Sequence, residues 1–471
     1  YVATEAECEI IINGAFQILE EVGIHINSEE ACDILSGAGC TVDENRIVKI
    51  PRELVKKAIE SAPSHIQIYN RNGEPAMDLG GTNVYFGNGP TNPFYNDFET
   101  NERREARKSD VTLTARLSDA LPNIDFVMSL AGIRDWNPLI ADVCEMHEML
   151  QNTTKPIVCW GVDVEGLEEQ FEMLAAVRGG WDKFLEKPMA ICYAGDPVTP
   201  LNIPEDAARK HIYCAKRGMT VLWPSGMQPG AVSPITLAGS QALGIAENLA
   251  GLVLTQTINP GCGYMAASVM LSFDMWTNQA AYGTPEHCLG ESMTADIYHY
   301  LGLPLWSTGC ATDSKIVDEQ AAMEAAFTAL NDVLSGANLV HDVGFMDSAM
   351  TSHLDMVTLA DEAIGYARRV GRGVEITEEN LLLDVIKEVG PCGEFITHPS
   401  TFEHFKQEYW FPNLLSHERF DVWKENPTDM RTRIHERTKK LLAEHKVPEL
   451  SADVVAQLDA TLAKAKTRIG E

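Results

Sequence analysis

The sequence predicts an α/β protein built on a (β/α)₈ TIM barrel, with an N-terminal helical cap and a C-terminal helical extension. Eight short runs of β-branched and aromatic residues begin about 30 to 45 residues apart, and each interval accommodates one strand, one crossover helix and two loops. The intervening segments carry helical spacing, as in Pro204 to Arg217 with Gly218 just past its end. The expected strands are 84–86, 124–130, 156–160, 189–193, 220–223, 263–267, 303–306 and 338–341.

An open doubly wound sheet is the alternative arrangement of eight such units. The glycine-rich dinucleotide motif does not follow the first expected strand, and no phosphate-binding loop of the G-x-x-x-x-G-K-[ST] type occurs in the sequence. Both absences weaken the open-sheet alternative and favour the closed barrel.

Three regions follow from these patterns. Residues 1–80 form the cap, where Ile12, Phe16 and Leu19 share one helical face and Pro51 begins a further helix. Residues 81–371 form the catalytic barrel, and residues 372–471 form the helical extension. His398 and His404 in the extension are six positions apart, which does not bring two imidazoles together on a helix, so structural packing is expected there.

The amino-acid composition limits the kinds of partner that this protein is expected to bind. The 37 basic and 68 acidic residues give a net charge of −31, and 45% of the residues are hydrophobic, as in a packed globular chain. The acidic surface argues against nucleic acid and against an anionic membrane. No run reaches about 18 consecutive apolar residues, and the first residues do not resemble an export signal, so a cytoplasmic protein acting on a small molecule or another protein is expected.

The eleven cysteines occur singly, without any C-x-x-C pair. This spacing suggests neither a disulfide framework nor a zinc–thiolate site, and several cysteines lie in apolar runs. Buried thiols in a reducing compartment, and no metal site, are therefore expected.

Aromatic residues concentrate where the expected strands end, and barrel enzymes place their chemistry at those ends. Three strand-end tryptophans are each followed closely by glycine, and a phenylalanine follows the eighth strand. Aromatic faces attract cations, quaternary ammonium groups above all, although large rings could equally fill the barrel top as packing. The candidate cage residues are Trp160, Trp223, Trp306 and Phe345.

Several polar residues near the expected strand ends could also belong to the site. Asp313 and Lys315 follow the seventh strand as either solvated charges or site residues, and Glu247 is either an exposed helix carboxylate or one that reaches inward. His341 and Asp342 could act as metal ligands, as a base with its orienter, or as a carboxylate-binding pair; a shared metal is disfavoured because adjacent strand residues point to opposite faces. The candidate catalytic residues are His341, Asp313 and Glu247, and the candidate polar substrate-binding residues are Asn88 and Lys315.

Several blocks of the sequence, in the same order, resemble the trimethylamine methyltransferase superfamily. The similarity spans roughly residues 5 to 425. The blocks that carry it are Ser233–Gly239, Ala246–Gly251, Asn259–Gly261, Tyr282–Glu286, Thr312–Gln320, Gly336–Asp342, Met346–Ser348, Thr397–Pro399 and Tyr409–Trp410.

The resemblance implies a barrel that moves a methyl group from an amine to the cobalt of a partner corrinoid protein. Founding members carry pyrrolysine at the barrel centre, whereas this chain contains none, so it resembles the branch without pyrrolysine. Members of that branch with known roles demethylate glycine betaine, proline betaine, carnitine or γ-butyrobetaine. The resemblance therefore implies a quaternary amine substrate, with glycine betaine favoured, no cofactor bound in this chain, a corrinoid-binding partner protein and a homo-oligomer.

A quaternary nitrogen gives this expectation a chemical basis. Such a nitrogen is already cationic, so in-line attack by Co(I) expels a neutral tertiary amine without a general acid or base, and the protein has to orient the cation and exclude water. Two alternatives remain: a barrel that binds a betaine without turnover, and a zinc or Schiff-base enzyme. The latter would need a ligand cluster or a strand-end lysine, for which Lys315 is the one candidate.

Overall fold

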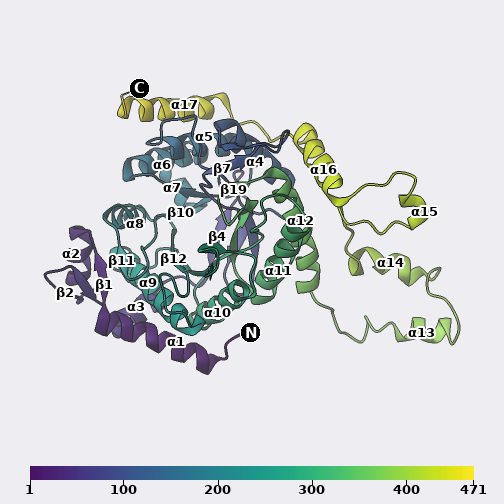
Figure 1. Cartoon of the computed structure of the whole chain (residues 1–471), viewed down its shortest axis with the longest axis horizontal. Coiled ribbons are helices and arrows are strands. Elements are labelled where there is room, and N and C mark those ends of the chain that lie inside the picture. Colours follow the sequence, from purple (N-terminus) through teal and green to yellow (C-terminus); the bar gives the residue numbers. More distant parts are fainter. Residues whose placement is uncertain (471) are drawn as a thin grey trace.

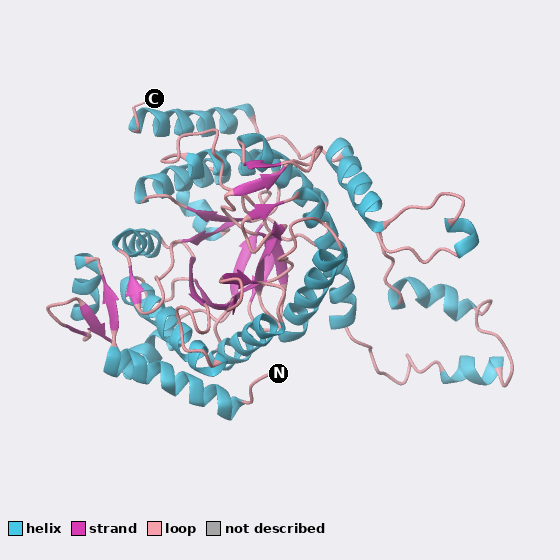
Figure 2. Cartoon of the chain, in the orientation of Figure 1, coloured by secondary structure: helices cyan, strands magenta, loops and turns pink. Residues whose placement is uncertain are grey.

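The computed structural model describes residues 1–470 and has a ring of parallel strands at its centre, surrounded by helices (Figures 1 and 2). Seven of the eight barrel positions are regular strands, and the second is a segment around Phe126 and Val127 that pairs through single bridges to Gly87 and Ile157. A further bridge joins Ala266 to Leu305, and parallel ladders make the remaining connections, so the ring closes and confirms the (β/α)₈ barrel. The regular strands are β6 (Tyr85–Asn88), β9 (Ile157–Trp160), β10 (Ala190–Tyr193), β12 (Val221–Met227), β13 (Tyr264–Met270), β16 (Trp306–Thr308) and β17 (Leu339–Val343).

Helices alternate with these strands along the chain, as the sequence pattern predicts. α8 (Glu205–Arg217) begins after Pro204 and ends at Gly218, which has a φ of 73° and so adopts the left-handed conformation common after helices. The other helices around the barrel are α4 (Lys108–Ala120), α5 (Ala141–Asn152), α6 (Val164–Arg178), α7 (Trp181–Glu186), α9 (Leu237–Ile258), α10 (Pro285–Leu301), α11 (Glu319–Ser335) and α12 (Leu354–Gly371).

Helix α9 is the one described helix that is long and apolar enough to cross a membrane by length and composition. Its most apolar window is 78% buried inside the protein, where it packs on β12 and β13. Its hydrophobicity is thus accounted for by burial in the barrel wall.

A hairpin of β4 (Ile66–Tyr69) and β5 (Pro75–Leu79) closes the amino-terminal end of the barrel. Its buried side chains pack into the barrel interior, and in Figure 1 the β4 label lies inside the ring. A ligand therefore has access from the opposite end, where the strands finish. The interior cluster consists of Ile66, Ile68, Met77, Leu79, Phe126, Met128, Val158, Ile191, Leu222, Met265, Ala267, Val269, Trp306 and Leu339.

The N-terminal region is not purely helical, contrary to the expectation from its sequence. α1 (Glu5–Gln17), a π-helical turn (η1, Ile18–Val22), α2 (Glu29–Gly37) and α3 (Arg52–Ser61) are interrupted by three strands. In β1 (Ile24–Ile26) both isoleucines are buried and His25 is not, which is the two-residue period of a strand. β2 (Thr41–Val42), β3 (Ile47–Lys49) and β11 (Asn202–Ile203) complete its sheet, and β11 ties the region to a barrel loop.

Small sheets cover the end of the barrel where the strands finish. β7 (Phe94–Asn96), β8 (Arg103–Glu105), β18 (Phe345–Met346) and β19 (Thr351–Ser352) form one of them, and the hairpin β14 (Ser272–Asp274) and β15 (Gln279–Ala281) forms another. Both belong to loops that follow barrel strands, so they surround the mouth of the barrel.

The C-terminal extension leaves the barrel and then returns to it. α16 (Met430–Glu444) packs on α12 and α4, and α17 (Ala452–Arg468) packs on α6 and α5. Residues 374–427 lie between α12 and α16 and carry α13 (Leu383–Val389), α14 (Pro399–Glu408) and α15 (Phe420–Trp423), which extend to the side of the barrel (Figure 1, right). The stretch 407–415 of this segment contacts α12, where Glu362 accepts hydrogen bonds from the amides of Asn413 and Leu414.

Candidate active site

His341 and Asp342 meet at the end of β17. A bulge lies between Val340 and Val343, and Asp342 has a φ of 76°. This local turn brings the two neighbouring side chains together, with His341 Nε2 3.0 Å from Asp342 Oδ1. The expectation that they point to opposite faces is therefore wrong, because the regular strand pleat does not continue through the bulge.

Burial shifts the pKa of both members of this pair toward the neutral form. Burial lowers the pKa of His341 to about 3, so the ring is neutral, and its Nδ1 lies 2.8 Å from the carbonyl oxygen of Ser307. With the Nδ1–H donated to that carbonyl, Nε2 can only accept a hydrogen bond. Burial also raises the pKa of Asp342 well above its ordinary value, and its Oδ1 has no hydrogen-bond partner within the described residues although it lies 3.0 Å from His341 Nε2.

Aromatic side chains lie at the same end of the barrel as this carboxyl. Burial raises the pKa of the Tyr193 and Tyr282 phenols, and the carboxyl of Asp342 contributes to both shifts, so both phenols lie within its electrostatic range. Trp160 pairs with Tyr193 in the strand register and is half-buried at the mouth. Phe345 approaches from the loop after β17. The mouth thus joins one carboxyl to several π faces, a combination suited to an organic cation.

Gly89 gives Asp342 and Phe345 their positions. A Cβ atom on this residue would overlap with Asp342 Oδ1 and with Cζ of Phe345, so both side chains pack directly on the glycine backbone. Gly89 therefore lies between Asp342 and Phe345, and the aromatic cage stays a prediction; Tyr193 and Tyr282 were not among the predicted cage residues. The signal for Tyr193 was its strand-end position, equivalent to that of Trp160.

Two of the predicted cage tryptophans do not line the mouth. Trp223 points outward from the barrel, where its ring lies edge-on to His211 at 4.6 Å and packs on Gly251 of α9. Trp306 points into the barrel but is fully buried, with its ring centroid 4.0 Å from that of His341. Leu222 takes the inward position on β12, which turns Trp223 to the helices; Trp306 forms the floor beneath His341.

Asn88 and Glu247 are also buried away from the mouth. Asn88 accepts a hydrogen bond from Ser118 Oγ at 2.7 Å and donates one to the carbonyl of Val343 at 3.2 Å. Glu247 reaches inward from α9 and accepts hydrogen bonds from Ser225 Oγ, from Thr199 Oγ1 at 2.8 Å and from the Leu201 amide at 2.5 Å. Both tie barrel elements together, so the structure assigns them to the framework.

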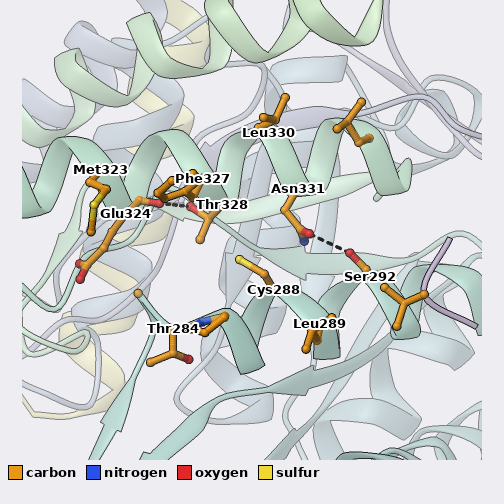
Figure 3. Close-up of a pocket in the computed structure, with 14 residues that line it drawn as sticks. Thr284, Cys288, Leu289, Ser292, Met323, Glu324, Phe327, Thr328, Leu330 and Asn331 are labelled. Carbon is orange, nitrogen blue, oxygen red and sulfur yellow. Dashed lines mark hydrogen bonds between the residues drawn. The ribbon is translucent and has the colours of Figure 1, made fainter.

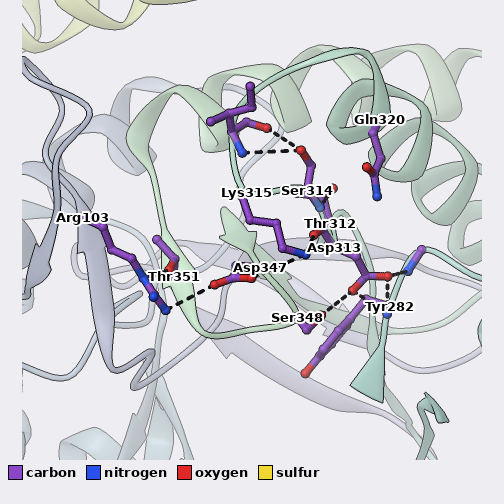
Figure 4. A network of polar contacts seen from close by, with 12 residues as sticks. Arg103, Tyr282, Thr312, Asp313, Ser314, Lys315, Gln320, Asp347, Ser348 and Thr351 are labelled. Carbon is purple, nitrogen blue, oxygen red and sulfur yellow. Dashed lines mark hydrogen bonds and ion pairs between the residues drawn. The ribbon is translucent and has the colours of Figure 1, made fainter. Parts of the chain in front are cut away.

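The charged residues after β16 organise the loops over the mouth (Figure 4). Asp313 accepts hydrogen bonds from the amides of Tyr282 and Gly283, at 3.0 and 2.9 Å, and from Ser348 Oγ at 3.0 Å. It therefore holds Tyr282 in place from a neighbouring loop. Lys315 is exposed at the rim, and its Nζ lies 3.6 Å from Asp347 Oδ1.

No metal centre accompanies these residues: within residues 1–470 no three His, Cys, Asp or Glu side chains gather as metal ligands. Nine of the eleven cysteines are buried. Burial raises the pKa of the Cys144 thiol, and a hydrogen bond with Cys192 together with burial raises that of the Cys159 thiol, which makes both unreactive at neutral pH.

The whole chain resembles proteins of one known family. The family model described as "Trimethylamine methyltransferase (MTTB)" matches residues 1–470. The chain belongs to the trimethylamine methyltransferase family. It is 29% identical over 472 residues to a glycine betaine methyltransferase of Desulfitobacterium hafniense, covering 100% of this chain and 98% of that protein. It is 33% identical over 409 residues to a trimethylamine methyltransferase of the same species, covering 86% and 82% of the two chains.

The family fold agrees with a solved structure. The monomethylamine methyltransferase of Methanosarcina barkeri superposes with a TM-score of 0.53 at 14% identity, covering 93% of this chain and 86% of that one. At this identity the likeness concerns the fold, and it is consistent with the closed barrel described above.

Opposite effects are expected from two tryptophan substitutions in this family member. Trp223→Leu should lower the free energy of unfolding by about 2–3 kcal/mol, because it leaves a cavity under α9. Trp160→Leu should instead weaken binding of a quaternary ammonium ligand by about 1–2 kcal/mol, because it removes a π face from the mouth. Denaturant unfolding and calorimetric titration measure the two effects, and equal losses of affinity in both variants would contradict the assignment.

Proposed function

We propose that this protein transfers a methyl group from a quaternary amine, with glycine betaine as the favoured substrate, to the Co(I) of a corrinoid held by a partner protein. The observation that carries the proposal is the Asp342 carboxyl among Trp160, Tyr193, Tyr282 and Phe345 at the barrel mouth. The relative named as a glycine betaine methyltransferase, similar over its full length, supports the same substrate class.

A trimethylammonium group fits the chemistry of these residues. It offers no hydrogen-bond donor, so π faces and one counter-charge are the contacts that stabilise it. When the cation enters, the Asp342 proton leaves and the carboxylate becomes the counter-ion, while His341 stays neutral against the Ser307 carbonyl. The aromatic rings also keep water from the cation, which strengthens its attraction to Asp342.

The methyl transfer requires few catalytic groups from this chain. The C–N bond breaks, its electron pair stays on nitrogen to give the neutral tertiary amine of dimethylglycine with its carboxylate unchanged, and the methyl carbon passes to the acceptor. The corrinoid supplies the reduced cobalt nucleophile. The residues of this chain bind and orient the ammonium group, so neither a general acid nor a resident metal is required for the step.

The carboxylate of a betaine needs a separate contact. Of the predicted donors, Asn88 and the Nδ1–H of His341 are engaged in hydrogen bonds within the barrel. Lys315 at the exposed rim donates a hydrogen bond to the carbonyl of Asp313 at 2.7 Å, and its Nζ also lies 3.6 Å from Asp347 Oδ1, a partner that a substrate carboxylate can replace. We assign the carboxylate contact to Lys315.

Exposed apolar side chains on the loops after the barrel strands support docking of a partner protein over the mouth. Trp276, at the tip of the β14–β15 hairpin, is the most exposed of them. Monomeric proteins rarely gather such residues around a functional opening without a partner. The rim residues are Leu139, Val198, Val232, Ile235, Met275, Trp276, Ile316 and Met350.

The test is demethylation with reduced cobalamin as acceptor. Glycine betaine, proline betaine, carnitine, γ-butyrobetaine, choline and trimethylamine are supplied singly, and both the methylated acceptor and the demethylated amine are quantified. Stoichiometric dimethylglycine and methylated cobalamin from glycine betaine support the proposal. Binding of glycine betaine without turnover favours the non-catalytic barrel, and turnover of trimethylamine alone overturns the quaternary substrate.

Binding of the betaine is expected to strengthen as the pH rises. Burial raises the pKa of Asp342 in the free protein, and a bound cation lowers it, so the complex binds fewer protons than the free protein. The dissociation constant should fall by up to about tenfold per pH unit between the two pKa values. Tyr193, Tyr282 and Glu291 lie within electrostatic range of the same carboxyl, and burial raises the pKa of each of them as well. Calorimetric titration across pH 6 to 9 measures the trend, and a constant affinity would contradict it.

A further inference from the structure

Among the three strand-end tryptophans, Trp160 differs in having a carboxylate partner for its indole. Its Nε1–H donates a hydrogen bond to Glu145 Oε2 of α5 at 3.0 Å. The indole nitrogens of Trp223 and Trp306 are buried and have no hydrogen-bond partner within residues 1–470. The barrel thus leaves two buried indoles unpaired, yet supplies an acid to the ring that is half-buried at the mouth.

Glu145 is enclosed by the protein. The residue is 0% exposed, and its second oxygen, Oε1, accepts a hydrogen bond from the Ile133 amide at 3.1 Å. Burial raises the pKa of this carboxyl to about 7 despite these hydrogen bonds, so holding its charge here costs stability. A neutral acceptor would satisfy the indole N–H without that cost, so the acid indicates a role beyond packing.

The backbone of Trp160 is held separately from its ring. Gln170 Nε2 of α6 donates to the Trp160 carbonyl at 2.8 Å, and Trp160 pairs with Tyr193 of β10 in the strand register. With the backbone fixed there and the ring nitrogen fixed by Glu145, the indole is anchored at both ends, which limits its rotation.

We propose that Glu145 is a positioning residue that orients the Trp160 ring and makes its face more negative toward a quaternary ammonium group. The inference rests on the proposed function, because it concerns the cation that the mouth binds. An N–H that donates to a carboxylate forms a charge-assisted hydrogen bond, which polarises the donor and moves electron density onto the ring. The attraction of a cation to the ring face grows with that density, so Glu145 acts through the indole without touching the cation.

Two substitutions on α5 separate this role from a structural one. Glu145→Gln removes the charge and leaves one acceptor oxygen for two N–H donors. Asp142→Asn is the matched control, since Asp142 is also buried and its Oδ2 accepts hydrogen bonds from the Val162 amide and Gln170 Nε2, each at 3.0 Å. The other oxygen of Asp142 has no partner within the described residues, so asparagine can place its amide nitrogen there and keep both bonds.

The first test is the nuclear magnetic resonance signal of the Trp160 indole N–H, assigned by its absence in Trp160→Phe. At a pH above its pKa of about 7, Glu145 is ionised, so in the wild type this proton should be the most downfield of the eight indole signals. Glu145→Gln should move it upfield, and Asp142→Asn should leave it in place. A wild-type signal among the others, or an unmoved signal in Glu145→Gln, overturns the proposal whether or not any amine is a substrate.

The second test is calorimetric titration with tetramethylammonium, which carries the head group alone. Glu145→Gln should raise its dissociation constant about tenfold, whereas Asp142→Asn should keep it within about twofold. In the Trp160→Phe background the effect of Glu145→Gln should fall below about threefold, because the N–H through which it acts is gone. An equal loss in both acid variants, or an undiminished effect without the indole, assigns Glu145 to the framework and overturns the proposal.

Binding of the cation elsewhere has to be distinguished. A cavity of about 650 Å³ between α10 and α11 also presents an aromatic ring, Phe327, and a carboxyl, Glu324 (Figure 3). Phe327→Leu should leave the affinity for tetramethylammonium within about twofold. A larger loss would place the cation in that cavity and overturn the proposal.

Turnover separates this inference from the proposed function. Glu145→Gln should raise KM for glycine betaine about tenfold and keep kcat within about twofold, because the positive charge declines as the C–N bond breaks and the contact therefore belongs to binding. A wild type that binds tetramethylammonium through Trp160 but demethylates no quaternary amine contradicts the proposed function and leaves the role of Glu145 standing. Turnover of glycine betaine with KM unchanged in Glu145→Gln contradicts the role of Glu145 alone, and a wild type that binds neither cation contradicts both.

Discussion

Replacing Asp342 with asparagine is expected to lower kcat/KM for glycine betaine by about a hundredfold, because it removes the counter-charge of a buried cation. The substitution is close to isosteric, and asparagine tolerates the left-handed backbone at this position as well as aspartate does. The amide also places no charge beside the neutral His341 ring. The loss should therefore appear in binding and turnover while the melting temperature changes little.

The matched control is Glu247→Gln, which neutralises another buried carboxyl of the same barrel. Glu247 faces Thr199, Leu201 and Ser225 between α9 and β12, not the mouth. Its replacement should leave kcat/KM within about threefold, since a group outside the site contributes mainly to the framework. If the two variants lose activity equally, or if Asp342→Asn retains it, Asp342 is not the counter-ion. The pH dependence of binding should also vanish in Asp342→Asn and persist in Glu247→Gln.

The barrel was predictable because its signals are local. Each strand is a short β-branched or aromatic run, and each crossover needs a helix, so spacing alone indicates eight units. The β strands of the N-terminal region were missed for a related reason. Runs as short as Ile24–Ile26 pair with β11, which is far away in the sequence, and a helical pattern in their neighbours masks them.

The direction of each strand-end side chain was harder to predict. Trp160 and Trp223 both lie near strand ends in sequence, yet Trp160 follows the inward Val158 by two residues, whereas Trp223 follows the inward Leu222 by one. A shift of one residue reverses the face. Nothing local fixes which residue of a strand is inward, because that depends on how the neighbouring strands are staggered around the barrel.

The meeting of His341 with Asp342 depends on a bulge, and bulges disrupt the regular alternation on which sequence reasoning relies. Asp342 was considered only as the neighbour of His341, although an aspartate in a left-handed conformation is a common feature of functional turns. The sequence singled out His341, whereas the counter-ion that we propose is its neighbour Asp342, whose backbone departs from the strand.

Gly89→Ala is expected to abolish most of the activity, lowering kcat/KM by about a hundredfold, since a shift of about 1 Å in a reacting group has that effect. The added methyl would occupy the space of Asp342 Oδ1 and the Phe345 ring at once. Neither side chain has room to retreat: Asp342 is fixed by the β17 bulge, and Phe345 is buried in the small sheet over the mouth. The cation would therefore lose its counter-charge and one π face through a single methyl group.

Gly226→Ala is the control variant, because it adds the same methyl group to a different glycine near a strand end. Gly226 lies near the end of β12 in the same barrel, and a Cβ atom there meets nothing within 4 Å. It should keep kcat/KM within about twofold and leave stability nearly unchanged, as surface substitutions usually do. The measurement is kcat/KM for demethylation of glycine betaine by both variants, with circular dichroism to verify that each is folded. Comparable activity in the two would show that Asp342 and Phe345 can move freely, and the cation site would then have to be sought on other side chains of the mouth.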